Sequence, residues 1–391
     1  MAEHRLAQGG PGPADREGAA ADGSVPVTFL AAKAGHGGSE RYLEVLVSTL
    51  GPAWVDRIFS LEDGPLVGRL RALGYDVTVV PAPGRRGIAP GAMRLRRALA
   101  RQRPRVVHAN GVKAALVAAL ATIGARTPIV WSKHDFSWDG PLARAIGLRS
   151  RQVVAVSSAL TTTFHGRTAS RVHIVPAGIP PPEVDREKAR DRIVGLLRCA
   201  EDVPIVTLVG RLQASKGQLE LLEVVPDVLE REPRARFCFV GEDHPFQPDY
   251  AKALRARCEA LGLGRSVTFA GHRDDAVWLI AGSDVIVLPS MPDHRGRGRE
   301  GSPLVAIESL AVGTPVVGYA HGGIPDALGD AGRLVDAGDR AGLRDAILEV
   351  LASDATRAEM VARGRERVAR RNLPAVMAAA MKERYREAAA G

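Results

Sequence analysis

The feature that most constrains the fold of this chain is an alternation of short β-branched runs with longer amphipathic stretches, repeated from Val25 onward. Short buried strands that alternate with helices are typical of a parallel sheet covered by helices. The predicted strands of the first half are VPVTFLA, VTVVPA, RVVHAN, TPIVWS, QVVAVS and RVHIVP. Helical stretches such as MRLRRALARQ and VKAALVAALA separate them. This pattern predicts one Rossmann-like unit that begins at residue 25.

A proline-rich segment interrupts the alternation. PAGIPPPEVDRE has four prolines within seven positions, which disfavours both a helix and a central strand. The alternation then restarts with the predicted strands PIVTLVG, ARFCFVG, SVTFAG, DVIVLP and TPVVGY. The sequence therefore predicts an α/β protein with two Rossmann-like parallel-sheet domains, residues 25–183 and 184–372, that face each other across a cleft. A length of 391 residues suits two domains.

Composition limits where such a protein works. Residues 1–24 are rich in Gly, Ala and acidic side chains and lack the apolar run of a signal peptide, so we expect a disordered tail. No stretch is apolar over the length that a membrane-spanning helix needs. Cys199, Cys238 and Cys258 are odd in number and too scattered for a disulfide framework or a metal site. We therefore expect a cytoplasmic protein.

Positive charge is concentrated in the first domain. The formal net charge is +9, and residues 25–185 hold 21 basic and 10 acidic side chains, whereas residues 186–391 hold 30 of each. Such an asymmetry can attract anionic lipid or an anionic acceptor. It also arises when arginines are spread over solvated faces, which is the more ordinary explanation.

The predicted helix MRLRRALARQ is the most basic element of that domain. Arg94, Arg97 and Arg101 share one of its faces. A helix that lies on a membrane normally exposes large apolar side chains as well. Here we expect the apolar side chains to pack inward instead; they are Met93, Leu95 and Leu99.

Because ligands of parallel α/β sheets bind beyond the carboxyl ends of the strands, residues that follow each predicted strand are the candidates for function. After the first strand, three glycines precede a helix whose first turn holds Ser39 and Glu40; they are Gly35, Gly37 and Gly38. Glycine allows a close backbone approach, and the free N–H groups of a helix start attract phosphate. The alternative is a tight turn that binds nothing.

The second domain opens with two cations after its first strand. In VTLVGRLQASKGQLELL, Arg211 and Lys216 lie between a predicted strand and a predicted helix. A guanidinium can clamp a pyrophosphate with paired hydrogen bonds, and an ammonium can neutralise the charge that grows on a leaving phosphate. Solvated surface cations are the alternative, but the strand-to-helix position favours a function.

The segment REGSPLVAIESLAVGTPVVGYAHGG carries Glu300 and Glu308, separated by seven residues. Pro303 suits the first position of a helix, which places Glu308 inside that helix among apolar residues, where a carboxylate needs a polar partner such as a ribose diol. Glu300 and the N–H groups of residues 302–305 could contact sugar hydroxyls or phosphate oxygens. The alternatives are a helix-capping acid at Glu300 and a side chain that reaches solvent at Glu308.

Weaker candidates also follow predicted strands. They are Glu242 with Asp243, His272 with Arg273, and His134 with Asp135. A lone histidine is more often structural than catalytic. His134 is still a candidate to donate a hydrogen bond to a sugar in the cleft.

A series of motifs runs in order along nearly the whole chain from Val25. They are GGSE, VVHANG, the histidine of KHD, AVSSAL, IVPAGI, GRL with KG, FVGED, FAGHRDD, DVIVLPS and the Glu-seven-Glu block that ends in GTPVVG and GGIPD. Together they resemble family 4 of the GT-B glycosyltransferases. The resemblance implies a GT-B fold, in which the helical C-terminal segment 373–391 returns to the first domain, and the retaining transfer of a sugar from a nucleotide donor.

The resemblance also implies roles for single residues. Arg211 and Lys216 would hold the pyrophosphate, Glu308 the ribose and Glu300 the transferred sugar, while the first domain would bind the acceptor. The residues expected to be catalytic are Arg211, Lys216, Glu300 and His134. Those expected to bind the donor are Gly37, Gly38, Glu242, Arg273, Gly301, Ser302, Pro303, Leu304, Val305 and Glu308. We expect no cofactor beyond the nucleotide-sugar co-substrate, and no required metal.

The substrates stay open. Our first choice is transfer of N-acetylglucosamine from UDP-N-acetylglucosamine to a small-molecule natural product, and the alternative is a lipid-linked or polysaccharide acceptor at a membrane surface, with the basic first domain in peripheral contact. Many family members have an aromatic residue at the position of Ser302, which leaves the sugar in doubt. We expect the basic loop HRGRGRE to be mobile, and no nucleic-acid partner. A sugar-nucleotide epimerase or a non-catalytic binding protein of the same fold is the alternative of another class.

Overall fold

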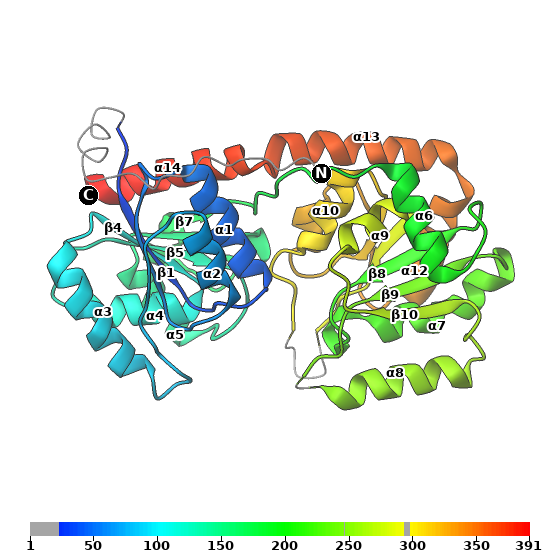
Figure 1. Ribbon diagram of the computed structural model, residues 1–391, viewed down its shortest axis with the longest axis horizontal. Coiled ribbons are helices and arrows are strands. Elements are labelled where there is room, and N and C mark those ends of the chain that lie inside the picture. The colour runs from blue at the N-terminus through cyan, green and yellow to red at the C-terminus, as the bar shows by residue number, and fades with distance from the viewer. Residues whose placement is uncertain (1–22, 246, 293–297) are drawn as a thin grey trace. The chain divides into compact units, whose positions relative to one another are not determined.

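The computed structural model of the chain describes residues 23–245, 247–292 and 298–391 (Figure 1). The chain divides into two compact units. Unit 1 holds the chain up to residue 156 together with residues 160–178 and 374–391, and unit 2 holds residues 157–159 and 179–373. Nearly all of the predicted tail and most of the HRGRGRE loop lie outside the described residues.

The boundary between the units next to the proline-rich segment falls a few residues earlier than the sequence predicts. Unit 1 ends at Gly178 instead of residue 183. The reason is that Ile179 already belongs to the packing of unit 2: its side chain is buried, and its N–H donates to the carbonyl of Asn372 over 2.8 Å. The proline-rich segment 180–182 therefore follows the boundary instead of preceding it.

Unit 1 contains a parallel sheet that, among the described residues, has seven strands in the order β3-β2-β1-β4-β5-β6-β7. The strands are β1 (Val27–Ala31), β2 (Val55–Ser60), β3 (Val77–Val79), β4 (Val106–Asn110), β5 (Ile129–Lys133), β6 (Gln152–Ala155) and β7 (Val172–Ile174). The central strands β1, β4 and β5 are buried along their whole length, as expected of a sheet covered on both faces.

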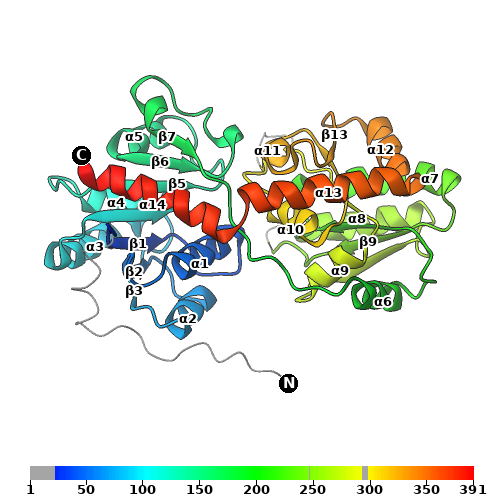
Figure 2. The ribbon, with the colours of Figure 1, turned by 90° about the horizontal axis from the view of Figure 1, so that it is seen from above.

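Helices cover both faces of this sheet. One layer consists of α1 (Gly38–Leu50), α2 (Pro65–Ala72) and the C-terminal helix α14 (Pro374–Ala390), which packs on α1, β4 and β5 (Figure 2). The other consists of α3 (Ile88–Gln102), α4 (Val112–Ala121) and α5 (Pro141–Arg149) (Figure 1). The chain adds β2 and β3 on one side of β1 and then crosses over to add β4 on the other side, so right-handed crossovers place the two sets of helices on opposite faces.

The inward packing predicted for the apolar side chains of α3 is only partly correct. Leu95 and Leu99 are buried against the sheet, but Met93 is exposed. In a helix of 3.6 residues per turn, Met93 lies on the opposite side from Leu95, on the same outer face as the neighbouring arginines.

Unit 2 repeats the same architecture. Its described sheet has six parallel strands in the order β10-β9-β8-β11-β12-β13. The strands are β8 (Ile205–Val209), β9 (Arg236–Val240), β10 (Val267–Gly271), β11 (Val285–Leu288), β12 (Val316–Tyr319) and β13 (Arg333–Val335). The helices are α6 (Arg186–Leu197), α7 (Gln218–Arg231), α8 (Pro248–Ala260), α9 (Ala276–Gly282), α10 (Leu304–Val312), α11 (Ile324–Leu328), α12 (Arg340–Ala352) and α13 (Asp354–Arg371).

The prediction of two Rossmann-like parallel sheets is confirmed. The strands that the sequence missed are β2 and β13. β2 contains the half-buried charged residues Asp56 and Arg57, which hide its apolar character, and β13 is a three-residue edge strand. No helix among the described residues is long and apolar enough to cross a membrane.

The strand order defines where ligands can bind in each unit. The order of connection reverses between β1 and β4 in unit 1 and between β8 and β11 in unit 2. At such a switch point the loops leave the sheet in opposite directions, and the crevice lies beyond the carboxyl ends of the two strands. The candidate residues that follow β1, β4, β8 and β11 therefore lie where ligands of such sheets bind.

Candidate functional site

In unit 2, the turn after β8 is fastened to the end of β11. A short 3₁₀ turn, Ala214–Lys216, ends at Gly217, whose φ of 72° is left-handed. A Cβ at Gly217 would lie 1.9 Å from the carbonyl oxygen of Pro289, so only glycine fits this approach. The N–H of Met291 also donates to the carbonyl of Ser215 over 3.2 Å. The turn that carries Lys216 is thus held directly against the switch point.

Lys216 and Glu300 come together at this switch point. The Nζ of Lys216 forms an ion pair with Oε1 of Glu300. Ser290, two residues beyond β11, donates from its hydroxyl to the same oxygen over 3.2 Å. The Lys216 side chain remains 30% exposed and that of Glu300 11%, so a ligand can still reach both groups. The aliphatic part of Lys216 lies over Gly210, in van der Waals range of a Cβ at that position.

The backbone of the Glu300 loop is fixed by a glycine pair. The N–H of Gly323 donates to the carbonyl of Glu300 over 2.9 Å. A Cβ at Gly322 or Gly323 would lie 2.4 or 2.1 Å from the carbonyl oxygens of Glu300 and Gly301, respectively. Ser157 donates from its hydroxyl to the carbonyl of Gly301. The position of the Glu300 carboxylate therefore depends on the absence of side chains at these two glycines.

His321 lies beside the same loop and was not singled out from the sequence. Burial lowers its pKa, the nearby Arg299 lowers it further, and Glu300 acts in the opposite direction. Its Nε2 atom is buried without a hydrogen-bond partner among the described residues. A neutral imidazole therefore lies next to the Glu300 carboxylate. Its position two residues after the predicted strand TPVVGY is the signal that could have found it.

Helix α10 begins immediately after this loop. Pro303 is its N-cap and Leu304 its first residue, one position later than predicted. The N–H groups of Leu304 and Val305 thus belong to the first turn, where they have no partner within the helix. Glu308 lies in the second turn of α10 and is buried, with 9% of its surface exposed. The first turn of α10 and the Glu308 carboxylate are thus both close in sequence to Glu300.

Arg211 is held through its backbone. Gln218, buried at the start of α7, donates to the carbonyl of Arg211 over 2.8 Å, and Tyr250 donates in turn to the Gln218 side chain over 3.3 Å. The Arg211 side chain is exposed and forms no ion pair with any carboxylate of the described residues. It is close enough to His244 to lower the pKa of that imidazole, although burial contributes more. Its guanidinium is available to an anion.

The other strand-end candidates of unit 2 differ in availability. Glu242 is exposed, whereas Asp243 is paired with Arg255 over 2.7 Å. Arg273 is paired with Asp275 through two hydrogen bonds of 2.8 Å, which raise the pKa of its guanidinium. The side chain of Arg273 is therefore used in the pair with Asp275, and a ligand can contact the backbone of its loop instead. His272 faces Asp274 at the surface.

In unit 1, the glycine loop leads into α1 as predicted from the sequence. Gly37 is the N-cap of α1 and Gly38 its first residue. Glu40 is buried below the loop, accepts a hydrogen bond from the Ser39 hydroxyl over 2.6 Å, and leaves no room for a Cβ at Gly37. The loop therefore lies close to a buried carboxylate, while the first N–H groups of α1 point out of the helix start.

His134 belongs to a chain of hydrogen bonds that fixes its proton. Asn110, the last residue of β4, donates from Nδ2 to the carbonyl of Ser39 over 2.9 Å. Its Oδ1 atom therefore faces Nε2 of His134, 2.7 Å away. Because an amide oxygen only accepts, the proton of a neutral His134 is on Nε2 and Nδ1 is the acceptor.

Burial lowers the pKa of His134 to about 4, although the carboxylates of Asp135 and Glu40 act in the opposite direction. The imidazole is thus neutral at pH 7. The sequence predicted that His134 donates a hydrogen bond to a sugar. In the structure its single N–H is used by Asn110, so the ring offers Nδ1 as an acceptor for a ligand hydroxyl instead.

A buried lysine positions the loop that carries His134. Lys133, the last residue of β5, is 1% exposed. Its Nζ donates to the carbonyl of Asp135 over 2.6 Å and to the carboxylate of Asp139 over 2.5 Å. The Asp135 carboxylate accepts from the N–H of Ser137, so it closes a local turn. Neither Lys133 nor Asn110 was assigned a role from the sequence, although Asn110 ends a predicted strand and Lys133 directly follows one.

The two groups of candidates lie in different units, each at the switch point of its own sheet. Gly37, Gly38 and His134 belong to unit 1; Arg211, Lys216, Glu300 and Glu308 belong to unit 2. Over the described ranges, no cluster of three or more His, Cys, Asp or Glu side chains is arranged to hold a metal ion. Two Rossmann-like units with cations and acidic side chains at a switch point suit the binding of a nucleotide-containing, anionic ligand.

Comparison with known proteins identifies the family. A family model described as Glycosyltransferase Family 4 matches residues 36–182, and one described as Glycosyl transferases group 1 matches residues 191–367. These matches cover most of unit 1 and of unit 2. The chain belongs to family 4 of the glycosyltransferases.

Among curated relatives, D-inositol 3-phosphate glycosyltransferase of Corynebacterium efficiens is 29% identical over 60% of both chains. A GDP-mannose-dependent monoacylated alpha-(1-6)-phosphatidylinositol monomannoside mannosyltransferase of Corynebacterium glutamicum is 29% identical over 43% of both. The chain spans about half the length of the curated relatives that it matches. Among solved structures, Anabaena HepE in complex with UDP is 23% identical, with a TM-score of 0.79 over 92% of this chain and 99% of that one. This last similarity concerns the fold.

Proposed function

We propose that this protein is a retaining glycosyltransferase that transfers a sugar from a UDP-sugar to a small hydroxylated acceptor. The observation that carries the proposal is the arrangement of Lys216, Glu300 and Ser290 where β8 and β11 end. A cation paired with an acid in this position can neutralise a leaving diphosphate while the acid accepts hydrogen bonds from sugar hydroxyls.

The remaining residues of unit 2 extend this donor site. The free guanidinium of Arg211 and the N–H groups at the start of α10 suit the two phosphates. The carboxylate of Glu308 suits the ribose hydroxyls, because its two oxygens can accept hydrogen bonds from both hydroxyls of a diol. Among the UDP-sugars we place UDP-N-acetylglucosamine first, and the small Ser302 leaves room for a substituent on the sugar.

The chemistry of the proposal requires no covalent enzyme intermediate. The bond between the anomeric carbon and the phosphate oxygen breaks as the acceptor oxygen attacks from the same face, and the leaving phosphate takes the acceptor proton. Lys216 and Arg211 stabilise the negative charge of that phosphate, so a chelator of divalent metals should leave turnover unchanged. Nδ1 of His134 accepts a hydrogen bond from a sugar hydroxyl and orients it.

For the acceptor we propose a soluble cyclitol-like or related natural-product hydroxyl compound. The D-inositol 3-phosphate glycosyltransferases among the relatives support a polyol, and the basic character of unit 1 suits one that carries a phosphate. The phosphatidylinositol mannoside mannosyltransferase of Corynebacterium glutamicum favours a lipid-linked acceptor as the second candidate.

A donor panel tests the proposal. Purified protein is incubated with UDP-, GDP- and dTDP-sugars, and nucleoside diphosphate release and thermal stabilisation are measured for each. We expect UDP-N-acetylglucosamine to stabilise the protein and to release UDP slowly, and faster once inositol phosphate is added. If no sugar nucleotide stabilises the protein or reacts, the donor site is wrongly assigned. An epimerase would instead convert the UDP-sugar without releasing UDP.

A further inference from the structure

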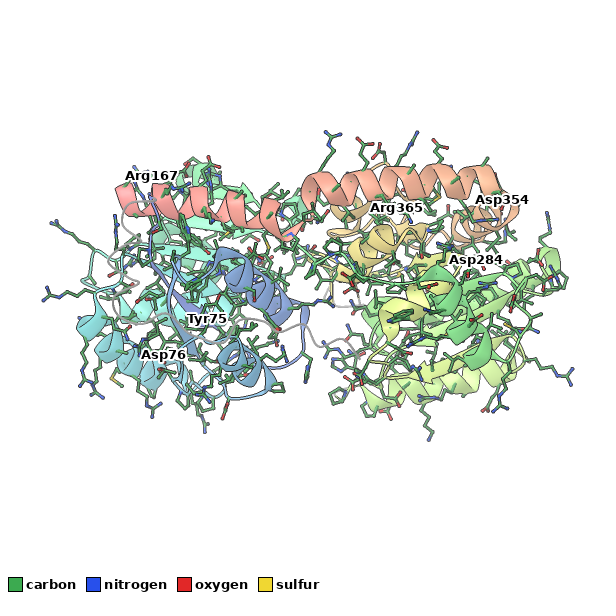
Figure 3. The ribbon with its side chains drawn as sticks, turned by 45° about the horizontal axis from the view of Figure 1, so that its top comes forward. Tyr75, Asp76, Arg167, Asp284, Asp354 and Arg365 are labelled. Atoms are coloured by element: carbon green, nitrogen blue, oxygen red, sulfur yellow. The ribbon has the colours of Figure 1, made fainter. Side chains whose placement is uncertain are left out.

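The outer surface of the layer α3–α4–α5 carries positive charge without neighbouring acids. Between Asp76, labelled in Figure 3, and Asp135 the chain contains eleven Lys and Arg residues and no Asp or Glu. The exposed arginines of this stretch include Arg94, Arg96, Arg97, Arg101, Arg103, Arg105 and Arg126. None of these seven forms an ion pair with a carboxylate of the described residues. Within the described part of the chain, the charge of this surface is therefore not compensated by carboxylates.

The same surface exposes large aliphatic side chains. Met93 on α3 is 55% exposed, Ile123 just after α4 is 58% exposed, and Leu148 at the end of α5 is 57% exposed. Exposed aliphatic groups of this size have a cost in water that a partner would remove.

Hydrogen bonds show that these side chains belong to one continuous surface. Arg96 of α3 donates to the carbonyl of Ile123 over 2.6 Å. Arg149 of α5 donates to the carbonyl of Thr122 over 2.9 Å. The segment after α4 is therefore joined to the middle of α3 and to the end of α5. We call the exposed side chains of this region the α3–α5 surface; they are Met93, Arg97, Arg101, Ile123, Arg126 and Leu148.

We propose that the α3–α5 surface docks on an anionic lipid bilayer. Arginines near an anionic membrane contribute about 1 kcal/mol each, and aliphatic side chains between them can enter the boundary between headgroups and acyl chains. Duplex or single-stranded nucleic acid would match the charge as well. However, residues 77–126 contain no Phe, Tyr or Trp on which bases could stack, and exposed Ile and Leu have no role against phosphates.

The surface lies away from the candidate site of unit 1. Helix α4 starts two residues after Asn110, at the carboxyl edge of the sheet, and Ile123 follows its other end. A ten-residue helix is about 15 Å long. A bilayer on the α3–α5 surface would thus leave the edge with Asn110 and His134 open to solution, which suits soluble substrates. The inference does not depend on the proposed activity.

Sedimentation of the full-length protein with lipid vesicles tests the inference. Vesicles of phosphatidylglycerol and phosphatidylcholine are compared with vesicles of phosphatidylcholine alone. We expect binding to the anionic vesicles only, and a drop of about 30-fold for the double variant Arg97→Gln/Arg101→Gln, at about 1 kcal/mol per arginine. The matched control is Arg265→Gln/Arg371→Gln, which removes two exposed arginines of unit 2 that form no ion pair with a carboxylate of the described residues, and should change binding less than twofold.

A second double variant, Ile123→Ser/Leu148→Ser, tests the apolar contribution and should weaken binding about tenfold. Thermal unfolding of every variant verifies that the fold is retained, as expected for exposed positions. Equal losses for the unit 1 variant and its unit 2 control would contradict the inference, because the effect would then follow from net charge. So would an unchanged affinity of Ile123→Ser/Leu148→Ser, or tighter binding to duplex DNA than to anionic vesicles at equal phosphate concentration.

Discussion

The close approach of Gly217 to Pro289 leads to the sharpest test of the donor site. Replacing Gly217 with Ala has two separate consequences. A left-handed backbone costs a residue with a Cβ about 1–2 kcal/mol. In addition, the new Cβ would lie 1.9 Å from the Pro289 carbonyl oxygen, so the turn with Lys216 and the end of β11 must separate by about 1 Å. Separation of a packed contact of this kind costs about 1–3 kcal/mol more.

Gly262 provides a matched control for the first of these effects. Its φ of 68° is nearly that of Gly217, but no atom lies within 4 Å of a Cβ built on it. The free energy of unfolding of Gly262→Ala should therefore fall only by the backbone cost, whereas that of Gly217→Ala should fall by both costs. The assay is thermal unfolding of the two variants, where 1 kcal/mol corresponds to roughly 2–4 °C in a unit of this size.

The functional readout separates the two variants further. Moving Lys216 by about 1 Å from Glu300 should reduce turnover by about 100-fold, since catalytic charges act only when they are correctly positioned. Gly262→Ala should keep wild-type turnover with UDP-N-acetylglucosamine. If Gly217→Ala and Gly262→Ala lose equal stability and Gly217→Ala keeps its turnover, then the fastening of the Lys216 turn to β11 has no role.

Two further predictions concern single side chains. Burial lowers the pKa of His134 to about 4 from an ordinary value of 6.5, so between these pH values the unfolded chain binds a proton that the folded chain does not. The free energy of unfolding should therefore fall as the pH decreases from 6.5 to 4, with full stability above 6.5. In denaturant titrations, His134→Gln should reduce the slope of the free energy of unfolding against pH by up to about 1.4 kcal/mol per pH unit. An unchanged slope would mean that His134 is protonated in the folded protein over this pH range. Lys216→Met should lower kcat by about 100- to 1,000-fold with little change in KM. Glu308→Ala should weaken UDP binding by about 10- to 100-fold, measured by calorimetry. If both variants keep wild-type kinetics, these residues do not belong to the site.

The strands and the division of the chain into two domains could be predicted from local patterns. Runs such as VVHAN and IVTLV are β-branched and short, and they become β4 and β8 because such residues fit a sheet that is buried on both faces. The same patterns indicate the strand ends, where Arg211 and Lys216 follow β8 and His134 follows β5. What the pattern missed, such as β2, had charged residues within the strand.

The partners of these residues depend on contacts that no local pattern contains. Lys216 and Glu300 are separated by 84 positions in the sequence. Asn110 is 71 positions away from Ser39, whose carbonyl orients the Asn110 amide. From the sequence, His134 was a hydrogen-bond donor, because nothing nearby in the chain shows which nitrogen carries its proton. The fold places Asn110 next to Nε2 and thereby makes the ring an acceptor.

The sequence by itself determined the class of the protein: two alternating β/α halves, a basic first half, and a family whose motifs lie at the strand ends. These are properties of residue type and spacing along the chain, and they do not depend on which distant segments come into contact. The tertiary structure alone decided that Gly217 must be glycine, that Lys216 is paired with Glu300, and that Met93, Ile123 and Leu148 emerge among arginines on one surface. Each of these depends on which distant segments come into contact, because packing and hydrogen bonding act over distance in space and not along the chain.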